Sequence, residues 1–437
     1  MKSIKFIQLG KVIERNKEQV TIEDNQTYKQ VTVRLWGKGV QLRDEVKGHE
    51  IKSAKRFIVK PNQFIISKID ARNGASGLIP NELDGAVTTG DFLSFNFNED
   101  LIIPEYLFWL SKTTWFIEQC VKASSGTTNR VRLNEKKFLE IEIPLPNIEQ
   151  QKVVIQKINN VVGLINQAET ELNEQNELVA ELQKAILCQG IQGKLLEQNS
   201  SDEPVSELLE RLQKEKGGQI QDEIPISEVR FELPKGWEWV RLGDISSYIQ
   251  RGKSPKYSEI QEIPVIAQKC IQWSGFEIHK AKFIDPDTLK GYSDERFLKS
   301  NDLLWNSTGL GTLGRIIVYK EEYNPFKIAV ADSHVTVIRP FSNIVDSQFL
   351  FYWLSSPFVQ SEIESVSTGS TKQIELSTST VKEYPIPLAP LEEQKRIVKK
   401  IDSLMEYLNK LKEEIHLAKD EMQNFTKKVF QEAFGQL

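Results

Sequence analysis

A segment near the middle of this 437-residue chain recurs near its end. Residues 144–152 read PLPNIEQQK and residues 387–395 read PLAPLEEQK, at an offset of 243 residues. At the same offset residues 126–130 (GTTNR) meet residues 369–373 (GSTKQ). Solenoid repeats span about 20–50 residues, so this period is too long for one. The sequence therefore predicts an internal pseudo-twofold repeat of one unit, a globular part followed by a helical part.

Each copy opens with short runs rich in Val, Ile, Phe and Thr, which are typical of strands. We expect strands at 28–36, 56–59, 64–68 and 92–97 in the first copy and at 263–267, 303–305, 315–319 and 334–338 in the second. One short helix follows in each copy, at 105–120 and 347–364. Each globular part ends in a proline-containing strand, 142–146 or 384–390, which must lie at a sheet edge because proline has no N–H. The predicted class is α+β, with two globular mixed α/β domains of β-rich core.

The apolar spacing after each proline-containing strand changes to alternating steps of three and four, as in a coiled coil. Adding 243 to the first set gives the register of the second, so we expect two long helices in an antiparallel coiled coil. Polar seam positions (Glu169, Asn176, Lys412, Lys419) would fix the register of such a pair. The alternative is two surface helices, each packed on its own domain. The candidate partner-binding side chains are those of the seam: Ile155, Ile158, Val162, Ile165, Leu172, Val179, Val398, Ile401, Met405, Leu408 and Ile415.

Charge is distributed unevenly along the chain. The net charge of −5 is the sum of +4 over residues 1–146, −7 over 147–230, −2 over 231–385 and zero over 386–437. The acidic excess lies mainly in the middle, so a basic face elsewhere remains possible. The predicted parts are domain 1 (1–147), a central helical region (148–196), an acidic linker (197–230), domain 2 (231–388) and a C-terminal helical region (389–437).

The composition excludes several classes of protein. No apolar run approaches the ~20 residues that a membrane-spanning helix needs, and we expect no signal peptide. Three cysteines and four histidines lie far apart in the sequence, so we expect reduced structural thiols, a cytoplasmic location and no metal site.

Two short motifs resemble cofactor-binding or catalytic signatures but lack the neighbouring elements that such sites need. Gly309, Gly311 and Gly314 satisfy G-x-G-x-x-G, yet a β-like run follows where a dinucleotide site needs a helix. We therefore expect a glycine-rich β-hairpin loop there. Residues 324–326 (NPF) resemble half of an amino-methyltransferase signature, without a glycine-rich loop upstream. We predict no catalytic residue and no cofactor bound by this chain.

The remaining candidates are polar and basic loops, which recur in both copies. Arg and Lys neutralise phosphates, Ser and Thr position a duplex, and Arg, Asn and Gln can read base edges. Solvated surface loops also contain such residues. For any single candidate residue, we favour the interpretation that it belongs to a solvated loop without a DNA contact. The candidate DNA-binding residues are Arg34, Lys38, Arg43, Lys55, Arg56, Lys68, Arg72, Asn73, Thr127, Thr128, Asn129, Arg130 and Arg132 in the first copy. In the second copy they are Arg251, Lys253, Lys256, Lys269, Asn306, Thr308, Arg315, Ser370, Thr371, Lys372 and Gln373.

Trp36 and Trp305 are candidate base-facing aromatics, although packing within a sheet is the interpretation we favour for both.

Several stretches, in this order, resemble the DNA-specificity (S) subunit of type I restriction-modification systems. Residues 143–152 and 387–395 resemble the start of that family's helical regions, and 182–187 followed by 193–195 the end of the central helix. Residues 202–208 (DEPVSEL) resemble the family's linker, and 233–244 (LPKGWEWVRLGD) the opening of its second recognition domain. With the repeat, the resemblance covers essentially the whole chain.

The resemblance implies two target recognition domains, each reading one half of an asymmetric bipartite site in double-stranded DNA. The helices would set the spacing and dock two modification (methyltransferase) subunits. S-adenosylmethionine, ATP and Mg chemistry would belong to those and to restriction (translocase/endonuclease) subunits.

Three alternatives remain open: the specificity subunit of a type IIB-like enzyme, a coiled-coil scaffold or adaptor with no DNA role, and an enzyme with an unrecognised site.

Overall fold

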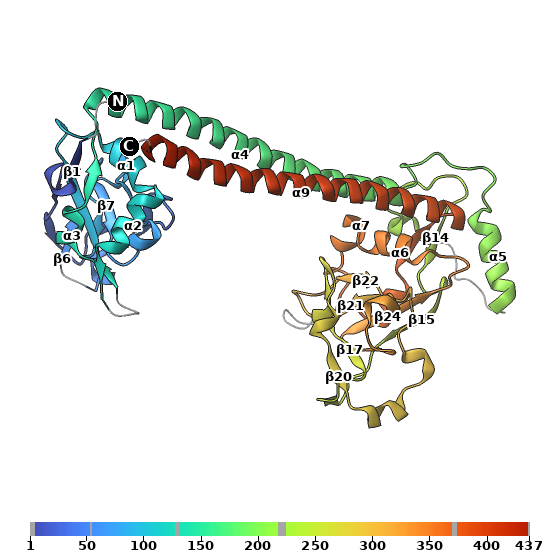
Figure 1. The fold of residues 1–437 in the computed structure, drawn as a ribbon. Helices are drawn as coiled ribbons and strands as arrows, with labels where there is room; N and C mark the ends of the chain where they lie inside the picture. The colour runs from blue at the N-terminus through green and yellow to red at the C-terminus, as the bar shows by residue number, and fades with distance from the viewer. Residues whose placement is uncertain (1–4, 53–54, 127–130, 217–223, 369–373, 436–437) are drawn as a thin grey trace. The chain divides into compact units, whose positions relative to one another are not determined.

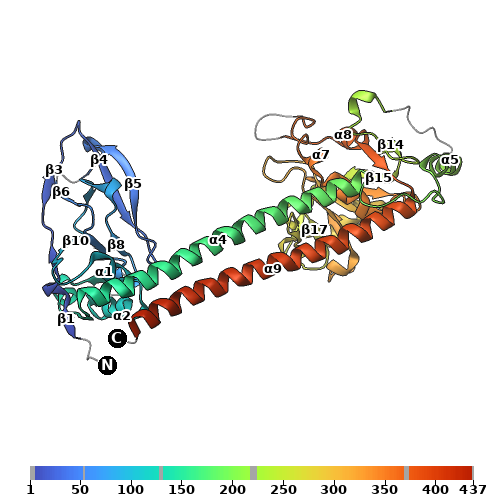
Figure 2. The same ribbon diagram turned by 90° about the horizontal axis from the view of Figure 1, so that it is seen from above.

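The computed structural model describes residues 5–52, 55–126, 131–216, 224–368 and 374–435. It divides into two compact units (Figures 1 and 2). The first unit comprises residues 1–175 and 414–437, and the second comprises residues 176–413. Each unit therefore combines one globular domain with a part of both long helices. This arrangement confirms the predicted α+β class.

The first domain is built on two mixed layers of strands. A four-stranded antiparallel sheet has the order β2-β10-β7-β8, and a five-stranded sheet has the order β3-β6-β9-β4-β5. The strands of the first sheet are β2 (Ile13–Arg15), β10 (Phe92–Phe97), β7 (Phe64–Ser67) and β8 (Ser76–Leu78). Those of the second are β3 (Gln19–Thr21), β6 (Lys55–Ile58), β9 (Val87–Thr88), β4 (Thr27–Val33) and β5 (Val40–Lys47). A short pair, β11 (Ser124–Ser125) and β12 (Arg132–Leu133), lies beside them.

The second domain repeats the four-stranded sheet of the first, but its second sheet has four strands where the first domain has five. Its four-stranded sheet has the order β15-β24-β21-β22, and a second sheet has the order β16-β20-β17-β23. The strands of the first sheet are β15 (Ser246–Arg251), β24 (Val335–Pro340), β21 (Leu303–Asn306) and β22 (Ile316–Val318). Those of the second are β16 (Tyr257–Ser258), β20 (Lys282–Ile284), β17 (Pro264–Ile266) and β23 (Val330–Ala331), and a hairpin is formed by β18 (Ile271–Gln272) and β19 (Gly275–Phe276).

One parallel pair of strands shows the equivalence of the two domains most directly. In the first domain β4 pairs in parallel with β9 through Val87, and in the second β17 pairs in parallel with β23 through Val330. Val87 and Val330 are separated by the repeat offset of 243. In each domain a later strand pairs antiparallel with the first of the two: β5 with β4 directly, and β20 with β17 after the inserted β18–β19 hairpin. The connections β4–β5 and β17–β20 are therefore equivalent.

The glycine-rich motif lies in a hairpin, as predicted. Strands β21 and β22 pair antiparallel on either side of it, and Gly309 and Gly314 adopt the left-handed backbone that such a turn requires. Asn324 of the second motif accepts a hydrogen bond from the backbone N–H of Phe326 (3.0 Å), which makes a local turn.

The single short helix predicted in each copy is wrong, because each is two helices. In the first domain the chain turns at Thr113, whose hydroxyl accepts the N–H of Phe116 and so caps a new helix. In the second, Pro357 begins a new helix, since proline fits its first turn. The four helices are α1 (Pro104–Ser111), α2 (Thr114–Lys122), α6 (Ser347–Leu354) and α7 (Pro357–Gln360). Two further short helices are α3 (Glu135–Leu139) and α8 (Thr378–Lys382).

The proline-containing strands lie at an edge, as expected. Strand β13 (Glu142–Pro144) pairs with β1 (Phe6–Gln8), and β25 (Pro385–Leu388) pairs with β14 (Glu238–Arg241), each in a two-stranded sheet. The long helix follows within a few residues: α4 (Ile148–Ile191) in the first copy and α9 (Leu391–Gly435) in the second.

Within each unit α4 and α9 run antiparallel and bury the predicted seam. Ile155, Ile158, Ile165 and Val179 of α4 are buried, as are Ile401, Leu408 and Ile415 of α9. The remaining seam residues Val162, Leu172, Val398 and Met405 are half-buried. Two polar seam residues make bonds across the helix pair: Lys419 Nζ donates to Asn173 Oδ1 and Lys412 Nζ to Gln183 Oε1, each at 2.7 Å. These bonds fit the predicted role of polar seam positions in fixing the register.

The predicted linker contains a packed helix. Helix α5 (Val205–Lys216) buries one face through Val205, Leu208, Leu209 and Leu212. The N–H of Val205 donates to the carbonyl of Gly236 at the start of the second domain (3.0 Å). The sequence predicts a short helix at 206–215 within this segment, and α5, with its apolar i, i+3, i+4, i+7 pattern, confirms it.

A buried glutamine in the first turn of each long helix attaches the helix to its domain. Gln151 Nε2 donates to the carbonyls of Leu101 and Pro146 (2.9 Å each), and its Oε1 accepts the N–H of Ile103 (2.9 Å). Gln394, 243 residues later, donates to the carbonyls of Ile344 (3.0 Å) and Ala389 (2.7 Å) and accepts the N–H of Asp346 (2.8 Å). Both side chains are fully buried. One side chain thus satisfies three backbone groups that a leucine would leave without partners.

We predict that Gln394→Leu lowers the free energy of unfolding by about 3 kcal/mol, because buried polar groups cost ~1–3 kcal/mol each when left unpaired. Gln151→Leu should act in the same direction on the first unit. Gln167→Leu is the matched control, since Gln167 lies exposed on α4 and bonds only Glu171 (3.0 Å) among the described residues. Urea unfolding of the full chain measures the effect, and equal stability of Gln394→Leu and the control would contradict it.

Candidate nucleic-acid interface

Three connections of the first domain come together on one surface, which we call the first loop cluster. They are the β4–β5 connection, the β7–β8 connection with its short 3-10 helix (Ala71–Asn73), and strand β12. The N–H of Trp36 donates to the carbonyl of Asn73 (2.8 Å), and the N–H of Gly37 to that of Gly74 (3.0 Å). The N–H of Leu133 donates to the carbonyl of Lys68 (2.8 Å). Backbone bonds therefore hold these loops to one another.

The first loop cluster carries several of the predicted basic residues. Arg34, Lys38, Arg72 and Arg132 are exposed, and Lys68 is half-buried. Arg132 pairs with Asp91 (2.8 Å), and Arg34 donates to Gln41 (3.1 Å). Asn73 is half-buried and bonds Asp70 (3.4 Å), so its amide is partly engaged. The cluster combines exposed cations with ordered backbone, which suits phosphate binding.

Three predicted residues lie on strands of the five-stranded sheet and not in the loops. Arg43 is on β5, where it pairs with Asp44 (3.0 Å), and Lys55 and Arg56 are on β6. Burial and the nearby charge of Arg43 lower the pKa of Arg56. Arg56 is only half-buried, yet its Nε is enclosed and has no hydrogen-bond partner among the described residues.

Most basic candidates of the second domain already have partners within the chain. Arg251 pairs with Glu375 and donates to the carbonyl of Ser333 (2.9 Å). Lys256 pairs with Asp285 (3.0 Å), and Lys253 donates to the carbonyl of Gly291 (2.7 Å).

Two further basic candidates complete the second domain. Arg315 donates to Gln272 and to the carbonyl of Gly311 (2.6 Å), whereas Lys269 is exposed. A phosphate would have to displace such partners, so this domain presents less free positive charge than the first.

Asn306 was a wrong choice for a DNA contact. Its side chain is fully buried, and its Nδ2 donates to the carbonyl of Gln268 (3.2 Å), so it supports the loop from inside. Thr308, half-buried beside it, bonds His334 Nδ1 (2.8 Å) and Gln268 Nε2 (2.9 Å). A short polar run in sequence does not reveal which of its members face inward.

Eight candidates lie outside the described residues. They are Thr127, Thr128, Asn129, Arg130, Ser370, Thr371, Lys372 and Gln373.

The two tryptophans singled out in the sequence differ in placement. Trp305 is 0% exposed and its Nε1 donates to the carbonyl of Gly314 (3.0 Å), so packing is the correct interpretation there. Trp36 is 70% exposed, and sheet packing is wrong for it. A third residue, Trp273 in the β18–β19 turn, is 57% exposed and was missed. Its setting in a polar run beside glycine (QWSG) was the available signal.

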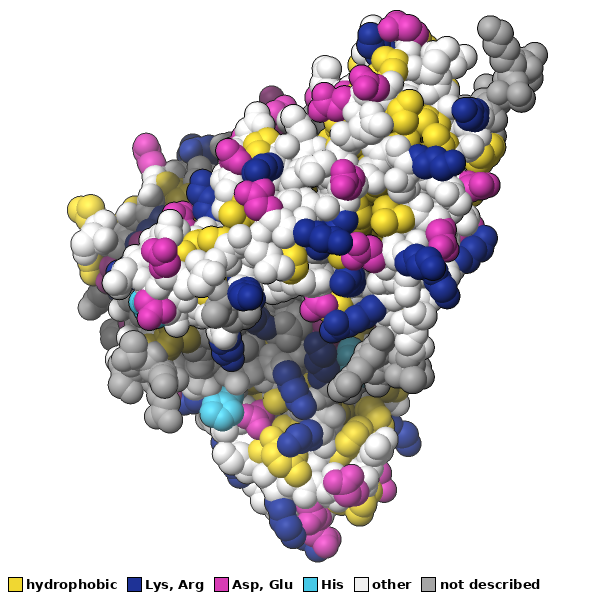
Figure 3. All heavy atoms as spheres, turned by 90° about the vertical axis from the view of Figure 1, so that its left-hand side faces the viewer, with side chains coloured by type: hydrophobic (Ala, Val, Ile, Leu, Met, Phe, Trp, Pro, Cys, Tyr) yellow, Lys and Arg dark blue, Asp and Glu magenta, His cyan; other side chains and the backbone are white. Residues whose placement is uncertain are grey.

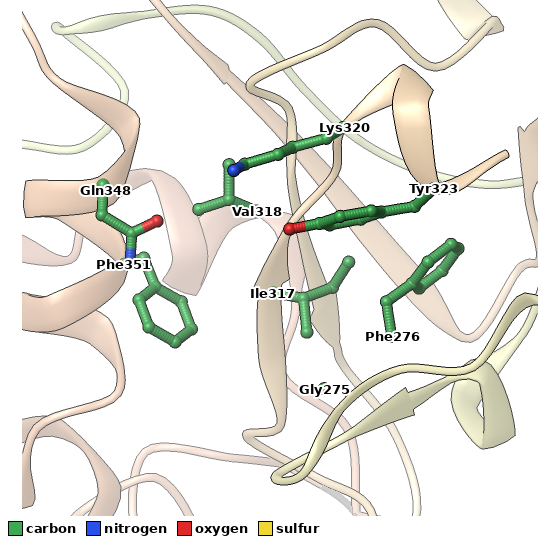
Figure 4. A pocket seen from close by; sticks show the side chains of 8 residues that line it. All are labelled: Gly275, Phe276, Ile317, Val318, Lys320, Tyr323, Gln348 and Phe351. Atoms are coloured by element: carbon green, nitrogen blue, oxygen red, sulfur yellow. The ribbon is translucent and has the colours of Figure 1, made fainter. Parts of the chain in front are cut away.

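Figure 4 shows a pocket of about 480 Å³ in the second domain, between the β18–β19 hairpin, β22 and α6. Phe276, Ile317 and Phe351 supply apolar walls, and Lys320 Nζ lies 5.6 Å from the ring centre of Tyr323. The described lining residues include no carboxylate, thiol or imidazole.

Two other searches of the described residues bear on function. They contain no group of three or more His, Cys, Asp or Glu side chains placed to hold a metal ion. They also contain no helix long and apolar enough to span a membrane. The three cysteines are unpaired, and burial raises the pKa of the Cys120 thiol to about 12. On the face drawn in Figure 3, Lys and Arg side chains are interspersed with Asp and Glu.

The seam side chains cannot serve as an external docking surface where they are buried. Ile155, Ile158 and Ile401, for example, face the helix pair and the domains. The docking role that we assigned to the buried seam residues is therefore wrong, because these side chains are already buried between the two antiparallel helices. The exposed apolar residues of the two helices include Leu164, Leu178, Leu182, Tyr407, Leu417 and Phe425.

A family model described as the type I restriction modification DNA specificity domain matches residues 1–177 and 234–417. The chain is 30% identical over 247 residues to the EcoEI specificity subunit of Escherichia coli, with 54% of this chain and 41% of that protein covered. It is 26% identical to the EcoAI specificity subunit of the same species, with 73% and 62% covered. The crystal structure of the HsdS subunit from Thermoanaerobacter tengcongensis matches with a TM-score of 0.55 at 19% identity, covering 99% of this chain and 97% of that one.

The fold thus comprises two domains that share a four-stranded sheet, each packed on the pair of long helices. The chain belongs to the family of type I restriction-modification DNA-specificity proteins. It spans less than two thirds of the length of the EcoEI and EcoAI subunits. Nothing in these likenesses favours a scaffold or a type IIB-like enzyme.

We predict that Arg72→Ala weakens the binding of duplex DNA by the complex of this chain with its modification subunits. Removing one phosphate contact should also reduce the slope of log affinity against log salt by about 1. Lys157→Ala, an exposed change on α4, is the control. Fluorescence anisotropy at several salt concentrations measures both quantities, and a slope equal to the control would exclude Arg72 from the interface.

A second prediction concerns Lys112, beneath the β4–β5 connection. A Cβ atom on Gly37 would lie 3.2 Å from its Cγ, and its Nζ lies 4.2 Å from the ring centre of Phe108. Burial lowers the pKa of Lys112 to about 8, against about 10.4 in an unfolded chain. Between these values the native state binds fewer protons than the unfolded state, so the free energy of unfolding rises with pH.

Lys112→Met should remove that rise between pH 8 and 10, whereas Lys122→Met, exposed at the end of α2, should retain it. Urea unfolding at the two pH values makes the comparison, and the same rise in both variants would contradict the assignment.

Proposed function

We propose that this chain is the sequence-reading, non-catalytic subunit of a type I restriction-modification complex and acts on cytoplasmic DNA. Each globular domain would read one half of an asymmetric bipartite site. The observation that carries the proposal is the repeated domain itself: two domains with the same four-stranded sheet, attached to their helices by the same glutamine bonds, with different loop residues. Two domains that share a sheet but differ in their loops would suit two half-sites of different sequence, separated by a fixed spacing.

The long helices support the spacing role. A helix rises 1.5 Å per residue, so the 44 residues of α4 make a rod of about 66 Å. Polar bonds such as Lys419–Asn173 hold one register of the helix pair, as a spacing role would require.

The exposed apolar residues of the helices support the docking of two modification subunits. Leu164 and Tyr407 are separated by the repeat offset of 243, and so are Leu182 and Phe425. Leu164 and Phe425 belong to the first unit, and Leu182 and Tyr407 to the second. Each unit therefore exposes two apolar helix residues of the same origin, which would suit two like partners.

The chemistry would lie on the partners. In the proposed complex, S-adenosylmethionine would belong to the modification subunits, and ATP and Mg to the restriction subunits.

The direct test is methylome sequencing of cells that carry this chain with its modification subunit. We expect a bipartite methylated motif that requires this chain. Replacing residues 231–385 by another recognition domain should change one half of the motif only. A motif that is unchanged by the replacement, or absent while the partner is folded, would contradict the proposal.

We predict that Leu164→Asp with Phe425→Asp reduces the number of bound modification subunits from two to one per chain. Leu182→Asp with Tyr407→Asp should do the same, and all four changes together should abolish assembly. Leu178→Asp is the control, because Leu178 is equally exposed but its repeat equivalent is Glu421. Native mass spectrometry counts the subunits, and two bound subunits on either double variant would contradict this docking surface.

A further inference from the structure

Each domain exposes one tryptophan on the same connection of its fold. Among the described residues, Trp36 (70%) and Trp273 (57%) are the tryptophans more than half exposed. Trp36 lies between β4 and β5, and Trp273 lies between β17 and β20, at the tip of the β18–β19 hairpin. These are the equivalent connections defined above. A large indole exposed to water on the corresponding connection of both copies is not explained by packing.

The backbone of Trp36 is held in a costly conformation. Its φ is 60°, in the left-handed region that bulky residues rarely adopt. The bonds from Trp36 N–H to Asn73 and from Gly37 N–H to Gly74 hold it there, and Gly37 and Gly39, which follow it, also take left-handed φ angles. Rare backbone conformations that the surroundings enforce concentrate at functional sites. The loop thus presents the indole outward on a rigid support.

The surroundings of both tryptophans are cationic. Arg34 and Lys38 flank Trp36 in sequence, and Arg72 lies on the β7–β8 connection that accepts the Trp36 N–H. In the second domain Arg315, on the equivalent β21–β22 connection, donates to Gln272, the residue before Trp273. An aromatic beside arginines is the combination that binds an unstacked base next to its phosphate. A protein partner at this place would need acidic groups, and duplex DNA supplies phosphates.

We propose that Trp36 and Trp273 stack on bases of the bound duplex, one in each half-site, at a step where the DNA is kinked or a base is unstacked. This inference rests on the proposed function and adds the groups that contact the bases. Stacking is tolerant of base identity, so the tryptophans would favour deformable steps, and neighbouring polar side chains would read the bases.

The test uses the complex of the full chain with its modification subunits and a duplex that carries the methylated motif. Trp36→Ala and Trp273→Ala should each weaken binding about 5- to 100-fold, the range for losing one base–aromatic stack. The salt slope should stay at the wild-type value, because no charge is removed. Trp36→Phe should recover most of the affinity.

Trp36→Gly separates function from structure. Glycine adopts φ near +60° without strain, so this variant should melt at or above the wild-type temperature and yet bind DNA as weakly as Trp36→Ala. A merely structural role would make affinity follow the melting temperature.

Two outcomes would contradict the stacking inference, and a third would contradict the proposed function as well. Wild-type affinity in both alanine variants excludes stacking, and loss of modification-subunit assembly by native mass spectrometry makes the tryptophans a protein contact. If the wild-type complex itself fails to bind the duplex, the proposed function falls and the stacking falls with it. The wild-type measurement distinguishes that failure from the others.

Discussion

The hydrogen bonds of two buried glutamines determine how this chain is assembled. Gln151 and Gln394 each join the first turn of a long helix to the segment before α1 or α6 and to the end of a proline-containing strand. A glutamine supplies donors and an acceptor from one side chain, and burial makes the loss of any of these bonds costly. The direction in which each helix leaves its domain is therefore fixed by these local hydrogen bonds.

The helices in turn complete the domains. In the first unit Ile155 and Ile158 of α4 join one core with Phe430 and Phe434 of α9, and Trp109 stacks on Phe430 with ring centres 5.4 Å apart. In the second unit a Cβ atom on Gly190 of α4 would lie 2.6 Å from Ile401 of α9, so the helices approach closely. The core of the first domain is therefore incomplete without both helices, and this domain cannot turn on its helices without opening that core.

Much of this architecture could be predicted because the sequence of the domain and its helix occurs twice in the chain. The repeat of residues 144–152 at 387–395, the heptad spacing and the proline-containing strands gave the elements and the helix pairing. The sites were harder. Burial separates Trp36 from Trp305 and Asn306 from Thr308, and burial depends on contacts that sequence patterns do not contain. The break at Thr113 was missed because a capping hydroxyl competes with a continuous apolar pattern, and the pairing of Arg251 with Glu375 joins residues far apart in the sequence.

The central claim is that two separate surfaces of one chain read two separated sets of bases. Missing-base interference on the assembled complex tests it most directly, because it identifies the bases whose removal prevents binding. We expect two clusters of essential bases, separated by a gap in which every base can be removed without effect. A single continuous cluster, or a footprint in which no base is essential, would contradict the account.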